Sequence, residues 1–141
     1  MSQIAIRPAI AIALGAIPGA LSRFYISELS KAIFGKDFAY YGSFFVNVVG
    51  CFIIALFFTL NQERFKNWSA EIRLMITTGF CGALTTFSTY GLDTVTLLKK
   101  GNITVAVLYW VVSAVAGMIA ISLGVFIARL INPAGEDSLE R

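Results

Sequence analysis

Residues 79–91, Gly-Phe-Cys-Gly-Ala-Leu-Thr-Thr-Phe-Ser-Thr-Tyr-Gly, combine glycines with hydroxyl side chains inside a run that carries no charge. Glycine is the poorest ordinary helix former, so this composition predicts a break in the backbone near residues 82–86. Broken backbone persists at membrane depth only where protein buries it or where it lines a wet cavity, and its freed carbonyls and hydroxyls often hold ions. The chemistry expected here is therefore ion binding, with a close-packing helix face as the alternative.

The elements that position this stretch follow from composition. The 141 residues are 57% hydrophobic and 13% charged, whereas soluble domains carry roughly 25% charged residues. The charges cluster and leave long uncharged runs, residues 8–22, 38–62, 74–92 and 101–128. Since about 20 mostly apolar residues cross a bilayer, the sequence predicts an all-α integral membrane protein with four transmembrane helices.

The expected helices cover residues 4–27, 39–60, 72–98 with the interruption near 82–86, and 103–131, in one four-helix membrane domain over residues 1–141. Residues 132–141 contain proline, glycine and acids, and we expect a flexible tail. The start of the chain also imitates a signal peptide, because Arg7 precedes an apolar stretch with small residues. That alternative stays open at this stage.

Several functional classes are disfavoured by what the sequence contains. Because there is no histidine, imidazole metal ligation and histidine proton relays are excluded. Cys51 and Cys81 fall in different apolar segments and are expected to be buried small side chains. Lysines and arginines flank the spans, which indicates membrane anchoring and not nucleic-acid binding. No nucleophile–base pair or nucleotide loop is visible, so we do not expect an enzyme.

Polar residues in the other spans each have two interpretations. Arg23, near the end of the first span, either extends to the lipid headgroups or faces an aqueous vestibule that concentrates anions. Asn47 is the only strongly polar side chain in the middle of the second span, where its amide either joins helices or offers two donors to an anion. Tyr109, Ser113 and Gly117 share one stripe of the fourth span, a pattern more typical of a packing face with satisfied hydroxyls.

The positive charges give no preferred orientation in the membrane. Four crossings place Arg7, Arg64, Lys66, Arg73, Arg129 and Arg141 on one side and Arg23, Lys31, Lys36, Lys99 and Lys100 on the other. Orientation normally follows an excess of lysine and arginine in cytoplasmic loops, and here the two sides nearly tie. The sequence therefore predicts an antiparallel homodimer whose two helix breaks meet and whose carbonyls coordinate a monovalent cation.

Three motifs together resemble the CrcB/Fluc family of small fluoride channels over almost the whole chain. They are Gly15-x3-Gly19-Ala20-x2-Arg23, Val46-Asn47-x2-Gly50-Cys51 and Gly79-x2-Gly82-x2-Thr85-Thr86-Phe87-Ser88-Thr89. The resemblance implies a dual-topology dimer with two fluoride pathways and a buried structural sodium ion at the dimer centre.

The resemblance also implies roles for individual residues. The carbonyls of Gly82 and Thr85 would hold the sodium ion. The fluoride pathway would include Arg23, Asn47, Phe87, Tyr90, Tyr109 and Ser113, and the hydroxyls of Ser88 and Thr89 are further donors. At Tyr90 the chain departs from the family, which commonly has phenylalanine there.

Such a pathway is chemically coherent, because fluoride is strongly hydrated and needs donors to replace its water. All eight acidic residues lie in loops, in the tail or at span ends. Asp93, near the end of the third span, either lies at a pore mouth or, as surface charges usually are, is a solvated charge at a helix end. The expected function is passive fluoride export for detoxification, in a bacterial inner membrane. The alternatives are a small multidrug exporter, which needs a membrane-embedded carboxylate, and a membrane scaffold that transports nothing.

Overall fold

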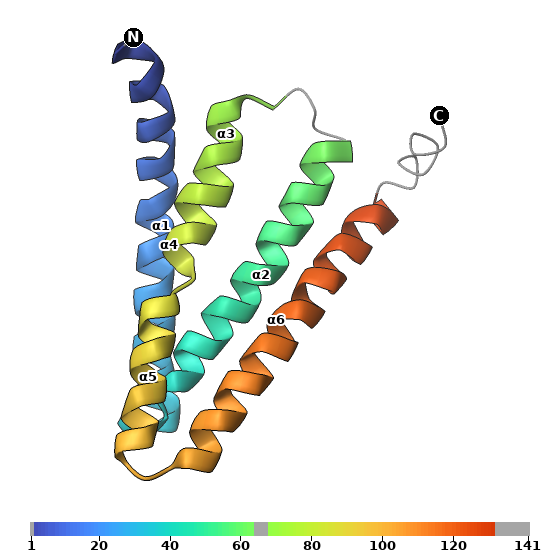
Figure 1. Ribbon diagram of the computed structural model, residues 1–141. Helices are drawn as coiled ribbons and strands as arrows, with labels where there is room; N and C mark the ends of the chain where they lie inside the picture. Colours follow the sequence, from blue (N-terminus) through green and yellow to red (C-terminus); the bar gives the residue numbers. More distant parts are fainter. Residues whose placement is uncertain (1, 64–67, 132–141) are drawn as a thin grey trace.

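The computed structural model describes residues 2–63 and 68–131, which are mostly helical and contain no β-strand (Figure 1). The elements in chain order are α1 (Ser2–Phe34), the 3₁₀ helix η1 (Lys36–Phe38), α2 (Tyr40–Glu63), α3 (Ala70–Leu74), the π-helix η2 (Met75–Cys81), α4 (Gly82–Leu84), α5 (Phe87–Lys99) and α6 (Ile103–Ile131). The expected tail at residues 132–141 lies outside the described residues.

α1 continues past residue 27, where the sequence placed its end, and reaches Phe34. Hydropathy marks only the part of a helix that crosses a membrane, whereas a helix ends where its backbone conformation changes. Gly35 supplies that change with a φ of 89°, a left-handed conformation that glycine adopts without strain. The polar link expected between the first two spans is correspondingly short.

Residues 70–99 form two helical parts that meet at Thr85 and Thr86. The first part runs through α3, η2 and α4, and the second part is α5. Thr85 and Thr86 are extended, with φ/ψ of −79°/156° and −151°/115°. The sequence placed an interruption near residues 82–86, and the two non-helical residues fall at the end of that range. Figure 1 shows α4 leading into α5, with α4 packed on α1.

Glycines allow the helices to approach one another closely. A side chain at Gly15 would collide with the backbone of Met75, and one at Gly79 would lie 2.5 Å from the carbonyl oxygen of Ile12. On the other side of the bundle, a side chain at Gly124 of α6 would lie 2.7 Å from the carbonyl oxygen of Phe52 in α2. Small residues therefore bring α1 against η2, and α2 against α6, at backbone distance.

The outer surface of the bundle is apolar. Within the described residues, three segments are long and apolar enough to cross a membrane: Ile6–Phe34, Lys36–Asn61 and Ile103–Ile131. Large side chains along α1 and α6 stay more than half exposed, such as Leu14 at 57% and Met118 at 60%. Such surface is unfavourable in water and favourable in lipid, so the chain is a multi-pass membrane protein.

Candidate functional site

The helix break lines one wall of a groove of about 350 Å³ between α2 and the broken segment. The groove is lined by Asn47, Gly50, Cys51, Ile54, Thr77, Cys81, Gly82, Thr85, Thr86 and Phe87. Its walls therefore bring together polar groups from two separate stretches of the chain, the Asn47 amide of α2 and the backbone at the break.

Asn47 holds the break open through both of its polar atoms. Its Oδ1 accepts a hydrogen bond from the Thr86 backbone N–H at 2.8 Å, and its Nδ2 donates to the Thr86 carbonyl at 3.2 Å. In a continuous helix that N–H would bond to the carbonyl of Gly82. The Asn47 amide thus replaces a helical bond, which matches the helix-joining interpretation, and one Nδ2 hydrogen is left over for another acceptor.

Gly50 lets the break approach α2. A side chain at this position would overlap the Cγ2 methyl of Thr85. Gly50 lies one helical turn beyond Asn47, so the same face of α2 carries both the amide that binds the break and the space that receives it. This explains the spacing of the Asn47-x2-Gly50 motif in physical terms.

Thr86 begins α5 as its N-cap. Its Oγ1 accepts from the Thr89 backbone N–H at 3.1 Å, and it also donates to Thr89 Oγ1 at 3.0 Å and lies 3.2 Å from Ser88 Oγ. The hydroxyls of Ser88 and Thr89 are therefore tied to the cap. Sequence analysis gave Thr86 no separate role, although a threonine that precedes a helical stretch is a recognised N-cap signal.

The carbonyls expected to bind a cation are released by these same contacts. The Thr86 N–H, which would reach the Gly82 carbonyl, goes to Asn47, and the Thr89 N–H, which would reach the Thr85 carbonyl, goes to Thr86 Oγ1. Both carbonyls lie at the C-terminal end of the helical part 70–84, where the helix dipole is negative. Hard oxygen ligands with this polarity fit a sodium ion.

Aromatic rings extend from the groove along α5 to α6. The Phe87 side chain is 79% exposed, and its ring centre lies 5.9 Å from that of Tyr90. Tyr90 is buried, 5.0 Å from the ring of Tyr109, and its hydroxyl donates to the Trp110 carbonyl at 3.3 Å. The Tyr90 hydroxyl thus binds a backbone acceptor of α6.

A second polar group lies beyond these rings, and sequence analysis partly missed it. Asp93 was interpreted as a solvated charge, which is wrong, because its Oδ2 is buried without a hydrogen-bond partner. Ser43 of α2 and Tyr109 of α6 are its polar neighbours. The Tyr109 hydroxyl and the Ser113 Oγ are likewise buried and unpartnered. The packing of α2 and α6 over α5 buries the carboxylate, and no local sequence signal reports that packing.

Arg23 lies apart from the groove, from its cap and from the rings and polar residues beyond it. It lies on α1, half-buried, and does not line the groove at the break. The structure therefore brings Asn47, Gly82, Thr85 and Phe87 together in the groove, ties Ser88 and Thr89 to its cap, and places Tyr90, Tyr109 and Ser113 beyond it.

Comparison with known proteins assigns this architecture to a family. Residues 10–125 match the family described as CrcB-like protein, Camphor Resistance (CrcB). Proteins named fluoride-specific ion channel FluC are similar: that of Trichormus variabilis is 48% identical over 130 residues, 92% of this chain and 94% of the relative. That of Synechococcus is 42% identical over 130 residues, which are 92% of this chain and 98% of the relative. That of Chloroflexus aurantiacus is 42% identical over 120 residues, which are 85% of this chain and 94% of the relative. With a family match over most of its length and relatives at this level of identity, the chain belongs to the CrcB family.

Proposed function

We propose that this protein is a channel that conducts fluoride passively across the membrane, and that it is not an enzyme. The observation that carries the proposal is the 48% identity over 130 residues to a protein named as a fluoride-specific ion channel. The groove at the helix break supports it, because neutral donors and ring edges gather there. A channel passes its ion unchanged, so no catalytic residue is assigned.

The groove suits a small and strongly hydrated anion. Fluoride enters a region of low dielectric only where donors replace its water shell. The free Nδ2 hydrogen of Asn47 and the hydroxyls of Ser88 and Thr89 are such donors. The edge of the exposed Phe87 ring carries partial positive charge and can also face an anion. Beyond the groove, the hydroxyls of Tyr109 and Ser113 would continue the pathway, with Arg23 attracting anions at a vestibule.

We further propose that two copies assemble as an antiparallel dimer with two such pathways. In each copy, α3 to α5 together would form a fourth crossing of the membrane. The support is the exposure of Gly82 and Phe87 at the break, because freed backbone at membrane depth must be covered by protein or water. A second copy inserted in the opposite direction would cover this surface, and the near tie of positive charges permits both orientations.

A sodium ion would be held at the dimer centre by the carbonyls of Gly82 and Thr85. When bound, it would supply positive charge to backbone oxygens that have lost their helical donors. The role is structural, because fixing these carbonyls fixes the place where the two helical parts meet. The surrounding membrane is proposed to be the bacterial inner membrane, where outward leak of fluoride would detoxify the cell.

Two measurements test the proposal separately. The purified protein is reconstituted into fluoride-loaded liposomes, and efflux is followed with a fluoride electrode; efflux no faster than from empty liposomes overturns the channel function. For the topology, Asn102→Cys in the α5–α6 turn is labelled with a thiol reagent that cannot cross membranes. About half of the chains should react in sealed vesicles and the rest only after permeabilisation. Complete labelling, or none, overturns the antiparallel arrangement.

A further inference from the structure

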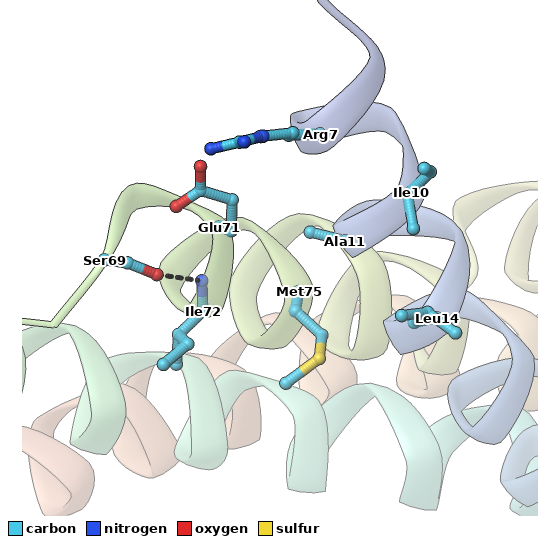
Figure 2. Close-up of a pocket in the computed structure, with 8 residues that line it drawn as sticks. All are labelled: Arg7, Ile10, Ala11, Leu14, Ser69, Glu71, Ile72 and Met75. Atoms are coloured by element: carbon cyan, nitrogen blue, oxygen red, sulfur yellow. Dashed lines mark hydrogen bonds between the residues drawn. The ribbon is translucent and has the colours of Figure 1, made fainter.

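A second groove, of about 490 Å³, lies between the N-terminal half of α1 and the start of α3 and shares no lining residue with the groove at the helix break (Figure 2). Its walls are apolar, with Ile10, Ala11 and Leu14 from α1 and Ile72 and Met75 from the α3 side. Two charged side chains, Arg7 and Glu71, lie at its mouth, where Figure 2 draws the guanidinium beside the carboxylate.

The groove is open at the end of the helices and closed toward their middle. At the closed end, Gly15 lets α1 lie against the backbone of Met75. Toward their N-terminal ends the two helices diverge, as Figure 1 shows for α1 and α3. A long, thin apolar group could therefore lie along the two helices. It would enter beside the charged side chains and end near Gly15, where α1 lies against Met75.

The charged mouth lies where lipid headgroups are expected. Arg7 is at the beginning of the apolar segment Ile6–Phe34. Trp68, one residue before the Ser69 cap of α3, packs on Phe57 with ring centres 5.3 Å apart. Basic residues at the ends of spans and tryptophan side chains mark the membrane interface. The apolar part of the groove consequently faces the level of the acyl chains.

The Arg7 guanidinium and the Glu71 carboxylate carry opposite charges and lie close together, but they do not form an ion pair. Arg7 contributes to lowering the pKa of Glu71, after the backbone and Ser69 hydrogen bonds at the helix cap. Yet the ion pairs found among the described residues involve other side chains, Lys31 with Glu28 and Lys100 with Asp37. A cation and an anion thus share one opening, each with capacity for an external partner.

We propose that this groove binds a phosphatidylethanolamine lipid. The guanidinium of Arg7 would donate to the lipid phosphate, the primary ammonium would donate to the carboxylate of Glu71, and one acyl chain would lie on the apolar walls. An anionic headgroup lacks a cation for Glu71. A choline headgroup has no N–H to donate, since methyl groups cover its nitrogen.

Native mass spectrometry of the full-length protein in detergent tests the proposal with three lipids that share the same acyl chains: phosphatidylethanolamine, phosphatidylcholine and phosphatidylglycerol. We expect the ethanolamine lipid to bind about tenfold more tightly than the choline lipid, the value of one hydrogen bond to a charged group. Glu71→Gln should remove this preference and leave choline-lipid binding unchanged. Arg7→Gln should weaken both, because both carry the phosphate.

Matched variants separate this site from general surface charge. Arg73→Gln alters an exposed arginine of α3 that does not line the groove, and Glu28→Gln alters an exposed glutamate on α1. Neither should change the lipid preference. Equal binding of the ethanolamine and choline lipids, preference for the glycerol lipid, or an equal effect of Arg73→Gln and Arg7→Gln would each overturn the proposal. So would failure of any lipid to bind, the result expected if a second copy covers the groove.

Thermal unfolding, followed by tryptophan fluorescence, provides a second readout. A ligand that binds only the folded state raises the melting temperature, and at a fixed concentration a tighter ligand raises it more. Ethanolamine lipid should therefore raise the melting temperatures of the native protein and of Arg73→Gln more than choline lipid does. For Glu71→Gln, the two lipids should raise the melting temperature equally. Equal stabilisation of the native protein and Glu71→Gln by ethanolamine lipid contradicts the assignment.

Discussion

Asn47→Asp is the sharpest test of the groove, because it changes one atom of the amide that holds the break. An aspartate can still accept from the Thr86 N–H, which lies 2.8 Å from Oδ1 in the native protein. It cannot donate to the Thr86 carbonyl, so the 3.2 Å bond is lost and an oxygen faces an oxygen. The lost bond costs about 1 kcal/mol of stability.

The charge has a larger effect on conduction than on stability. At an effective dielectric constant of about 20, an anion that passes about 5 Å from the new carboxylate meets a repulsion of about 3 kcal/mol. A barrier raised by that amount slows passage by about two orders of magnitude. We therefore expect fluoride efflux from liposomes to fall about a hundredfold in Asn47→Asp.

Two further variants isolate the cause. Asn47→Leu loses both bonds to Thr86 without adding charge, and should lower the free energy of unfolding by about 2 kcal/mol. Asn102→Asp makes the same chemical change as Asn47→Asp at an exposed position before α6, and should conduct as the native protein does. If Asn47→Asp conducts within about twofold of the native rate, Asn47 does not lie beside the fluoride pathway.

Four further predictions concern the remaining parts of the site and the bundle. Phe87→Ile should slow fluoride efflux about threefold to tenfold, since a ring-edge contact contributes about 0.5–1.5 kcal/mol; an unchanged rate removes this ring from the pathway. Gly50→Ala should lower the free energy of unfolding by about 1–3 kcal/mol by overlapping the threonine at the break, whereas Gly91→Ala, with open space around it, should not. Lys100 holds the pKa of Asp37 below its usual value of 3.8 through a 2.6 Å hydrogen bond. Because the folded-state pKa of Asp37 is depressed, its hydrogen bond to Lys100 stabilises the protein above pH 3.8, and this stabilisation is lost as the pH falls through the lowered pKa of Asp37. The difference in melting temperature between the native protein and Lys100→Met should therefore vanish in acid. Replacing sodium by the bulky N-methylglucamine cation should lower the melting temperature, by the equivalent of about 2.7 kcal/mol where sodium is at 100 times its dissociation constant, and no shift would contradict a structural sodium site.

The approximate place of the break was predictable because its signal is local. Glycines and hydroxyls are poor helix formers at membrane depth, and residues 79–91 concentrate both. Which two residues become extended is not a local property. Thr86 leaves the helix because the Asn47 amide, 39 positions away in sequence, takes both of its backbone groups. Sequence analysis noted Asn47 as polar but could not tell which backbone it would meet.

The features that sequence analysis missed depend on packing between distant segments. The π-helix of Met75–Cys81 lies where Gly79 meets α1. Asp93 looked like a solvated charge because its neighbours in sequence approach the end of a span. It is half-buried, with its Oδ2 shielded from solvent, because Ser43 of α2 and Tyr109 of α6 lie against it. Hydropathy reports how each segment suits lipid and carries no information on which side chains face one another.

The break and its partners form one interdependent unit. Asn47 can hold Thr86 only because Gly50 admits Thr85 against α2, and the same contacts deprive the carbonyls of Gly82 and Thr85 of their helical donors. A carbonyl left without a partner in a lipid environment costs several kcal/mol, so an isolated chain could not keep this surface against acyl chains. The proposed second copy and the proposed sodium ion would each remove part of that cost. The features that would make the break unstable alone are therefore those that would favour the proposed assembly, and the same Asn47 amide that holds Thr86 keeps one Nδ2 hydrogen for the proposed fluoride pathway.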